Sequence, residues 1–340
     1  MARPRTQHVQ TVKQELLVRL GSGFHGPGSR FFSARAIARR FGVCYQTADR
    51  LLDELAVDGW LVRRPASGTY LPGGRCEYRG VDLIFHPRAR HPESFGARLR
   101  QLLQSEFHQA QIAVRDRWPS RGRIPLAARW LPIMWESPAA VAECVRRQCA
   151  GIMINDRPPA GLGALFLDSV SVDDFGGGAM AAELLRRHVP AGGVWVILAG
   201  PPSDQRSQAR VRGFLSRQPA TVIAAPNWYV QGGLTVAAKV LARRPAGIFC
   251  CNDRLAEAIC VLCAQRHMAP PCLVGFDDAP VAQRLGLTTI AIPWAGLVQA
   301  VVTAARRRLE HDSGGGMRHV LMPQPVIRWK RRVSMTAIRG

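Results

Sequence analysis

Apolar residues recur at helical spacing over the first 60 residues, with short breaks between the runs. One face of a first predicted helix is formed by Val9, Val12, Leu16, Leu17 and Leu20. Gly21 and Gly23 predict its end, because glycine accommodates the left-handed residue that terminates many helices. Ser33 predicts the N-cap of a second helix that carries Ile37 and Phe41.

A third helix and a hairpin follow. Gly42 predicts a turn, and the helix after it, from about Tyr45 to Asp58, would bury Ala48, Leu51, Leu52 and Leu55. Gly59 predicts the end of this helix. Residues 60–64 and 69–71 then read as two short strands joined by a turn that contains proline and glycine.

The pattern changes after residue 80, where apolar strands alternate with amphipathic helices. The predicted strands are 81–85, 111–114, 131–135, 151–154, 164–167, 194–199, 221–224, 247–250, 272–275 and 289–292. The helical runs include 138–148, 178–188, 203–216, 234–242, 254–266 and 296–311. This alternation predicts an α/β fold of doubly wound parallel sheets with helices on both faces, and its length indicates two lobes. Residues 115–129 interrupt the pattern, and we expect an irregular loop or an insertion there.

The chain of 340 residues carries a large positive charge. Lys and Arg number 46 against 24 Asp and Glu, which gives a formal net charge of +22. Such an excess attracts polyanions, of which nucleic acid is the commonest in a cell. A general bias toward arginine would also produce it, because the surplus is not confined to one region. The charge is therefore compatible with DNA binding without establishing it.

Nine cysteines raise the question of a metal site. They contain one Cys-x-x-Cys pair, Cys260 and Cys263, and His267 follows at a spacing that could complete a three-ligand patch. The pair lies in a helical run, so the favoured interpretation is buried, reduced thiols. We expect no metal and no cofactor.

The location of the protein is predicted from the absence of targeting signals. The first 30 residues contain no continuous apolar stretch of the signal-peptide kind, and no segment reaches the roughly 20 apolar residues of a membrane span. The odd number of cysteines also fits a reducing compartment. We expect a cytoplasmic protein without membrane contact.

The N-terminal pattern has the order of a winged helix-turn-helix, in which the second helix of the motif lies in the major groove of DNA. The three stretches that carry the likeness are 33–43, 51–55 and 58–70. Over about residues 9–71 the chain resembles the GntR-type winged-helix domain. The core of this motif is Ser33–Tyr70.

This resemblance implies a set of DNA contacts. Arg35 would reach a phosphate, and the recognition helix would present Cys44, Tyr45, Gln46, Thr47 and Arg50. The wing would contribute Arg63, Arg64, Ser67 and Gly68. Gln is suited to adenine edges and Thr to a thymine methyl group or a phosphate. Arg39 and Arg40 would more simply form a solvated helix face.

Three residues depart from the family pattern on the reading face. Cys44 stands where the family usually has Ser or Thr, and Tyr45 where it usually has Arg. Asp49 often corresponds to another Arg, so this carboxylate would face away from DNA. The target sequence cannot be transferred from the family.

The remainder resembles the effector domain of the lac-repressor family, which shares its fold with periplasmic sugar-binding proteins. The matching stretches, in order, are 172–181, 184–188, 210–214, 249–256, 274–278 and 287–290. The resemblance implies a small-molecule site between two lobes. Its polar residues would be Asn155, Asp173, Arg210, Asp253 and Asp277, and Trp228 would offer an aromatic face to a sugar.

Structural roles compete with some of these assignments. Asp253 and Asp278 could be helix caps or turn formers, and Trp228 could be part of the core. Polar residues just past strand ends do suit a ligand site, because open α/β sheets bind ligands at the carboxyl ends of their strands.

The predicted organisation has three parts. They are a winged helix-turn-helix at 1–72, a linker at 73–80, and a two-lobed ligand-binding domain at 81–335. Lobe 1 would comprise about 81–170 and 294–312, and lobe 2 about 171–290 and 318–335.

We therefore expect a DNA-binding transcriptional regulator of the arabinose-repressor kind of chimera, a repressor rather than an activator. Its partners would be double-stranded operator DNA, a second copy of the chain, and a sugar, polyol or nucleoside effector. A transport-type sugar-binding protein is an alternative. A winged-helix-fused aminotransferase is another, but it needs a Schiff-base lysine, and Lys239 lies on an amphipathic helix. No enzymatic motif is found, and we expect no catalysis.

Overall fold

The computed structural model describes residues 4–21, 25, 29–71, 78–92, 94–119, 126–147, 149–156, 167–190, 192–310 and 316–329. The chain divides into two compact units. The first unit comprises Met1–Ser171 and Trp294–His319, and the second comprises Val172–Pro293 and Val320–Gly340. None of the helices in the described ranges is long and apolar enough to cross a membrane.

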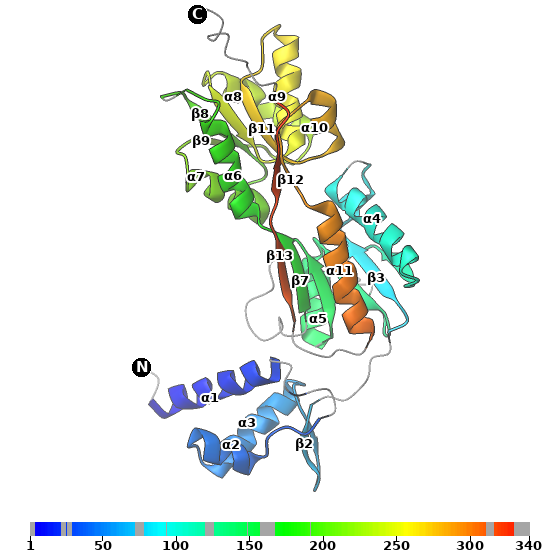
Figure 1. Ribbon diagram of the computed structural model, residues 1–340. Helices are drawn as coiled ribbons and strands as arrows, with labels where there is room; N and C mark the ends of the chain where they lie inside the picture. Colours follow the sequence, from blue (N-terminus) through cyan, green and yellow to red (C-terminus); the bar gives the residue numbers. More distant parts are fainter. Residues whose placement is uncertain are drawn as a thin grey trace, which may run out of the picture. The chain divides into compact units, whose positions relative to one another are not determined.

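The N-terminal segment of the first unit contains three helices and a hairpin (Figure 1). Its elements are α1 (Pro4–Gly21), α2 (Ala34–Phe41), α3 (Tyr45–Val57), β1 (Val62–Arg64) and β2 (Gly68–Tyr70). The two strands pair antiparallel. These helices and this hairpin confirm the secondary structure predicted from the apolar spacing.

Local sequence explains how α2 begins and ends. The Ser33 hydroxyl accepts a hydrogen bond from the amide of Ala36 at 3.2 Å, which satisfies one of the free N–H groups at the helix start. Gly42 ends the helix in the left-handed conformation, with φ +64°, which a residue without a side chain adopts at no steric cost. The chain can therefore turn tightly from α2 toward α3.

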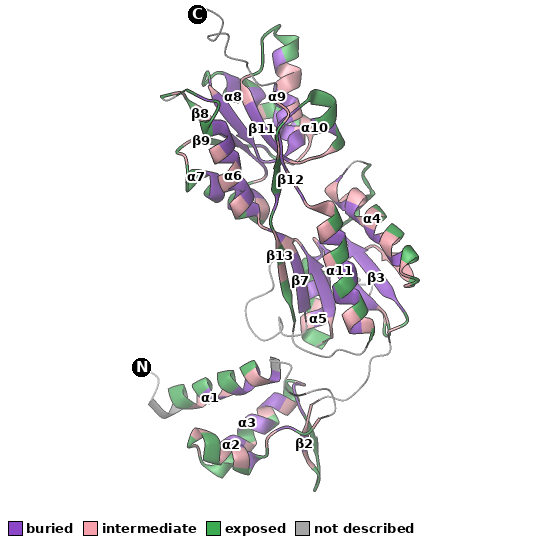
Figure 2. Ribbon diagram, viewed as in Figure 1, coloured by how far each residue is buried: buried purple, intermediate pink, exposed green. Residues whose placement is uncertain are grey.

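The N-terminal segment has a hydrophobic core of its own (Figure 2). Its fully buried residues come from all three helices and include Leu16, Leu17, Ile37, Leu51 and Leu55. Trp60 and Leu61, at the start of the hairpin, pack into the same core. This shared core attaches the hairpin to the helices.

The sheet of the first unit has the strand order β13-β7-β6-β5-β3-β4. The strands are β3 (Val81–Phe85), β4 (Val114–Arg117), β5 (Leu131–Trp135), β6 (Gly151–Ile154), β7 (Leu167–Val172) and β13 (Arg318–Leu321). The neighbours from β4 through β7 pair in parallel. The associated helices are a 3-10 turn η1 (Pro87–Arg90), α4 (Phe95–Gln109), α5 (Pro138–Arg147) and α11 (Trp294–Leu309). Side chains of α5 pack with Met134, and α4 contacts the adjacent Trp135, so helices cover both faces.

One predicted boundary in this unit was wrong. The strand expected at 111–114 lies at Val114–Arg117, inside the segment that we expected to be an irregular loop from 115 to 129. Arg115 can occupy an edge strand because its guanidinium pairs with the buried Asp82 carboxylate at 2.7 and 2.9 Å. The strand predicted at 164–167 is seen from Leu167 onward, and residues 164–166 lie outside the described ranges.

The second unit repeats this architecture with the strand order β14-β12-β11-β10-β8-β9. The strands are β8 (Trp195–Ala199), β9 (Thr221–Ala224), β10 (Gly247–Cys250), β11 (Cys272–Asp277), β12 (Thr289–Ala291) and β14 (Gln324–Val326). All neighbours pair in parallel except β14, which is antiparallel to β12. The helices are α6 (Asp174–Arg186), α7 (Gln205–Leu215), α8 (Val230–Leu241), α9 (Asp253–Gln265) and α10 (Pro280–Leu285).

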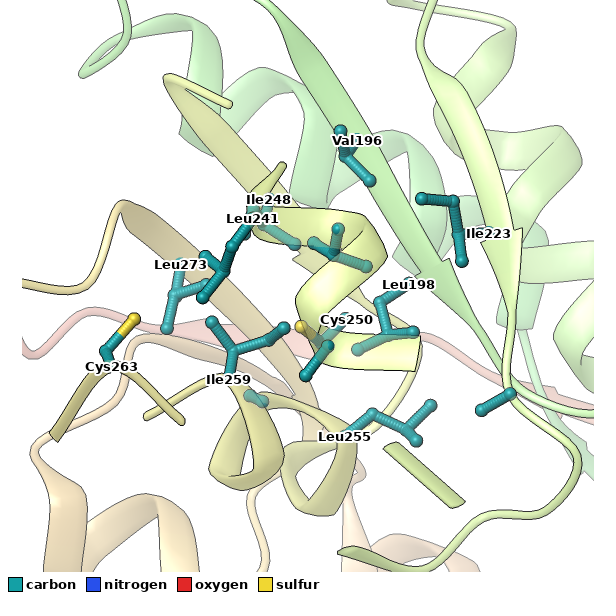
Figure 3. Close-up of a cluster of buried hydrophobic side chains, with 14 of the residues drawn as sticks. Val196, Leu198, Ile223, Leu241, Ile248, Cys250, Leu255, Ile259, Cys263 and Leu273 are labelled. Atoms are coloured by element: carbon teal, nitrogen blue, oxygen red, sulfur yellow. The ribbon is translucent and has the colours of Figure 1, made fainter. Parts of the chain in front are cut away.

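The core between the sheet and helices α8 and α9 is aliphatic (Figure 3). Cys250 and Cys263 are buried in it, and Cys260 packs against it. Burial raises the pKa of Cys260 to about 11, which keeps this thiol protonated. His267 is exposed, and no group of three metal-ligating side chains occurs in the described part of the chain. The geometry supports the interpretation of these cysteines as small apolar residues.

Helices α6 and α7 approach each other closely because glycines face the contact. A Cβ atom on Gly178 would lie 2.0 Å from the carbonyl oxygen of Arg210, and one on Gly213 would lie 1.9 Å from that of Phe175. The Gly in the Arg-x-x-Gly-Phe stretch is thus required by packing. This contact also fixes the position of Arg210 on α7.

Candidate functional site

Arg210 is the centre of a charged cluster in the second unit. Its side chain is 5% exposed. Its Nε donates to Asp174 at 2.7 Å, and its Nη1 donates to the carbonyl of Cys251 at 2.6 Å and to Asp277 at 3.1 Å. Burial disfavours the charge, but Asp174 and Asp277 outweigh it and raise the pKa of Arg210. The guanidinium therefore stays charged inside the protein.

One nitrogen of this guanidinium remains available. Among the described residues no acceptor is found for Arg210 Nη2. The face of the guanidinium lies 3.6 Å from the centre of the Phe276 ring, which holds its plane. A fixed N–H donor of this kind suits a hydroxyl or carboxylate group of a ligand.

Trp228 lies near Arg210, just after β9. Its indole nitrogen donates to Asp204 at 3.0 Å, and its carbonyl accepts from Asn252 at 3.0 Å. The Arg210 guanidinium is 5.8 Å from the ring centre. These contacts hold a half-buried aromatic ring beside the charged cluster, as expected for a surface that packs against a sugar ring.

Asp204 is a functional candidate that the sequence analysis did not single out. It is the N-cap of α7 and accepts from the amides of Arg206 and Ser207. Burial alone would raise its pKa, but the charge of Arg206 and these hydrogen bonds hold it at about 2. Asp204 is therefore a carboxylate at neutral pH, and it orients the indole of Trp228.

Unusual backbone conformations mark the carboxyl ends of the central strands. Positive φ angles occur at Glu136 (47°) after β5, Asn155 (55°) after β6, and Asp277 (101°) and Asp278 (52°) at the end of β11. Left-handed backbone is costly for residues with side chains and is often retained at functional sites. These backbone angles support Asn155 and Asp277 as candidates for ligand contact and add Glu136 to them.

The first unit carries its own polar group at the carboxyl ends of its strands. Arg88 pairs with Glu136, and its guanidinium lies 5.1 Å from the centre of the Trp135 ring. The Glu136 amide donates to Asp156 at 3.1 Å. In the described ranges, Trp135 Nε1 and the buried Ser137 hydroxyl have no hydrogen-bond partner. Position just after a buried strand was the only sequence signal for these residues.

Two of the predicted ligand contacts have structural roles in the described chain. Asp253 is fully buried and accepts from the Thr289 hydroxyl at 2.6 Å and from the Ala279 amide at 2.7 Å. Its burial and these two bonds support the structural role, and a ligand contact of Asp253 stays a prediction. Asp173 is the N-cap of α6 and accepts from Gly176 at 2.8 Å, which the chain requires with or without a ligand.

The residues predicted to read DNA gather at the start of α3. Cys44 is its N-cap, and Cys44, Tyr45, Gln46 and Arg50 are exposed. Thr47 is half-buried, with its hydroxyl 3.1 Å from the Cys44 sulfur. On α2, the predicted phosphate contact Arg35 is exposed, as are Arg39 and Arg40.

The hairpin lies across a groove from these helices. The groove has a volume of about 820 Å³, and its lining includes Arg30, Arg35, Tyr45, Arg64 and Ser67. Arg64 stacks on Tyr70 at 4.7 Å, and the Ser67 hydroxyl is 2.7 Å from that of Tyr70. Gly68 has φ +127°, and Arg30 lies against it. The groove is therefore basic and polar.

Arg63 is exposed and also lines this groove, but its guanidinium is already paired. Its two terminal nitrogens are paired with carboxylates of α3, Asp53 at 2.5 Å and Asp49 at 2.6 Å. Asp49 thus faces the hairpin, and the DNA contact expected of Arg63 stays a prediction.

Sequence comparison relates part of the chain to known proteins. Residues 137–300 match the family model of the periplasmic binding protein domain. A ribose operon repressor from Haemophilus influenzae is 28% identical over 146 residues, which is 39% of this chain and 44% of the repressor. The chain thus matches less than half the length of this relative.

Solved structures show the same fold. A LacI-family regulator from Enterococcus faecalis V583 with bound ribose has a TM-score of 0.61 and 20% identity, covering 74% of this chain and all of the other. A dimeric Lac repressor with an 11-residue C-terminal deletion has a TM-score of 0.61, 18% identity and coverage of 73% and 97%. A periplasmic solute-binding protein from Actinobacillus succinogenes with bound D-allose also has a TM-score of 0.61 at 18% identity, with coverage of 73% and 98%.

At these identities the structural matches establish the fold. Together with the family match, they correspond to the two six-stranded sheets described above. The winged-helix interpretation of residues 9–71 stays a prediction. The chain contains a periplasmic-binding-protein-like domain with the two-lobed α/β fold found in LacI-type regulators.

Proposed function

We propose that this protein is a DNA-binding transcriptional regulator controlled by a small polyhydroxylated effector, a sugar or a related polyol. The observation that carries the proposal is the Arg210 cluster. A guanidinium buried between Asp174 and Asp277 is expensive to assemble, and no acceptor for its Nη2 is found among the described residues. Such a site is typical of ligand recognition.

Three further features support a sugar. Trp228 offers an aromatic surface beside the charged group, and strained backbone marks the same sheet edge. The fold relatives named above were solved with ribose and D-allose. Purine nucleosides are a second ligand class, because an aromatic ring and an arginine would also bind a nucleobase.

A thermal-shift screen tests the effector assignment. The panel contains ribose, allose, xylulose, cellobiose and nucleosides. A true ligand at 100 times its dissociation constant stabilises the native state by about 2.7 kcal/mol, and Arg210→Gln should abolish this shift. Gln208→Ala, on the exposed side of the same helix, is the matched control. A shift that persists in Arg210→Gln would disprove the site.

DNA binding by the N-terminal segment is supported by its geometry. Helix α2, the Gly42 turn, α3 and the hairpin follow the order of a winged helix-turn-helix, and exposed side chains gather at the start of α3. We propose that α3 enters the major groove and that the hairpin lies along the minor groove. The solved Lac repressor relative is a dimer, and we propose that this chain also binds DNA as a homodimer.

Selection from a random duplex library by the full-length protein tests this proposal. A sequence-selective complex that weakens with salt is the expected result. Recovery of no enriched sequence, together with a sugar-dependent thermal shift, would favour a transport-type binding protein instead.

A further inference from the structure

Helix α3 carries more negative than positive charge. Within the helix and its C-cap, the carboxylates of Asp49, Asp53, Glu54 and Asp58 stand against one basic residue, Arg50. The phosphates of DNA would repel such a helix. If α3 lies in the major groove, its carboxylates must be neutralised within the protein.

Cations from two flanking elements provide this neutralisation. From α1, the Lys13 ammonium lies 3.0 Å from Glu54 and 3.4 Å from Asp58. From β1, the Arg63 guanidinium bridges Asp49 and Asp53 across four residues, or one turn, of α3. Hydrogen bonds to Asp53 and then Asp49 raise the pKa of Arg63. The negative charges on both sides of α3 are thus paired with cations of the protein.

Arg63 and its neighbour Arg64 differ in their surroundings. Successive side chains of a strand point to opposite faces, and here Arg63 faces α3 while Arg64 packs on Tyr70. Both arginines are exposed and line the basic groove. They differ in their partners, because Arg63 is paired with two carboxylates, whereas no carboxylate is found beside Arg64 in the part of the chain that the structure describes.

We propose that Arg63 is a positioning residue that neutralises Asp49 and Asp53 and ties the hairpin to the recognition helix, and that Arg64 makes the phosphate contact of the wing. This inference rests on the proposed DNA binding, and it replaces the contact that the resemblance implied for Arg63. It also gives Asp49 a role where the family often has an arginine.

The two ion pairs from Arg63 to Asp49 and Asp53, here called the bridge, predict that DNA affinity lost in one variant can be restored by further substitutions. Removal of Arg63 alone leaves two carboxylates unpaired beside the DNA and removes the ion pairs between the hairpin and α3. Conversion of all three side chains to neutral amides removes the repulsion together with the pairs, since loss of both partners is far less costly than loss of one. A phosphate contact, in contrast, cannot be restored by changing its neighbours.

The test compares four full-length proteins: wild type, R63Q, R64Q and R63Q/D49N/D53N. The DNA probe is a duplex recovered by the selection described above. Affinity is measured over a series of salt concentrations, and thermal unfolding is measured without DNA. All three altered residues of the bridge are partly exposed, so each variant should fold.

We expect R63Q to bind DNA about tenfold more weakly and to unfold at a lower temperature. The triple variant should recover wild-type unfolding, affinity within about threefold, and the wild-type slope of log K against log salt. R64Q should unfold like wild type but lose about 0.9 from this slope, the effect of one phosphate contact.

Two results would overturn the inference. A triple variant that stays as weak as R63Q, with a slope reduced by about 0.9, would make Arg63 a phosphate contact. Unfolding of R63Q at the wild-type temperature together with wild-type affinity for DNA would show that Arg63 neither positions the hairpin nor neutralises α3. If selection recovers no DNA, the proposed function fails, whereas the unfolding of R63Q and the triple variant still decides whether the bridge exists.

Discussion

At the scale of single residues, the Arg210 cluster shows how charge is kept inside a protein. Its cost is offset only because Asp174 and Asp277 both reach the guanidinium. Each partner is needed by the others, because an uncompensated charge at this depth is strongly unfavourable. The cluster should therefore respond sharply to loss of one member.

Arg210→Met should lower the free energy of unfolding by about 3–5 kcal/mol, because it leaves two carboxylates without their cation. Urea unfolding followed by circular dichroism measures this change. Gln208→Ala, an exposed change on the same helix, should stay within about 0.5 kcal/mol of wild type. An equally small effect of Arg210→Met would show that the cluster is not buried in solution.

The same variant should depend on pH in a defined direction. Burial already raises the pKa of Asp277, and Arg210 opposes that effect, so Arg210→Met should raise it further. A carboxyl group whose pKa is raised by folding binds more protons in the native state, and stability then falls as pH rises. Arg210→Met should therefore recover part of its lost stability between pH 7 and pH 5. Loss of stability over that range would contradict the assignment.

Asp204 should show the opposite behaviour. Its pKa of about 2 lies below the usual value near 4, so its contribution is present above pH 4 and is lost as pH falls toward 2. Asp204→Asn should flatten the loss of stability over this acid range, measured as melting temperature against pH. An acid profile identical to that of the wild type would show that Asp204 is not held by Arg206 and Trp228.

At the scale of elements, the packing of α6 on α7 positions the site. The backbones of the two helices lie so close that only glycine fits at Gly178 and Gly213, and Arg210 lies on α7 at this contact. Gly213→Ala would place a methyl group 1.9 Å from the carbonyl oxygen of Phe175, so the helices must separate. The site would move with them.

Gly213→Ala should destabilise the protein by about 1–3 kcal/mol and weaken effector binding, even though Gly213 touches no ligand. Calorimetry of unfolding and of binding measures both effects. The neighbouring Arg212→Ala, at an exposed position of the same helix, is the control and should change neither. Unaltered binding by Gly213→Ala would mean that Arg210 is positioned by its ion pairs alone.

At the scale of the whole molecule, the proposed function couples two sites in different parts of the chain. Any effector that changes the affinity for DNA must itself be bound with an affinity that DNA changes by the same factor. We expect this factor to be about 5- to 150-fold. The coupling holds whether the effector releases DNA or promotes its binding.

Paired titrations test this coupling. The affinity for selected DNA is measured with and without the effector found by thermal shift, and the affinity for the effector is measured with and without DNA. Equal factors in the two directions are the expected outcome. Tight binding of both partners with a factor of one would rule out regulation by that effector.

Much of the fold could be predicted from local patterns. The helices around Ile37 and Leu51, most of the parallel strands and the packing of helices on both faces follow from apolar periodicity, because burial needs one apolar side per element. The strands β13 and β14 were not predicted, and β4 was placed too early in the chain. Arg210, Trp228 and Asp277 were found through a family resemblance, and the structure places them together.

The remaining features depend on contacts between residues distant in the sequence. The strand position of Arg115 depends on its ion pair with Asp82, and the buried structural role of Asp253 depends on its hydrogen bond with Thr289. The sequence by itself determined the periodicity, the caps and the turns, because these depend on neighbours along the chain. Only the tertiary structure decided which charges meet, as in the bridge from Arg63 to Asp49, because an ion pair is a property of positions in space.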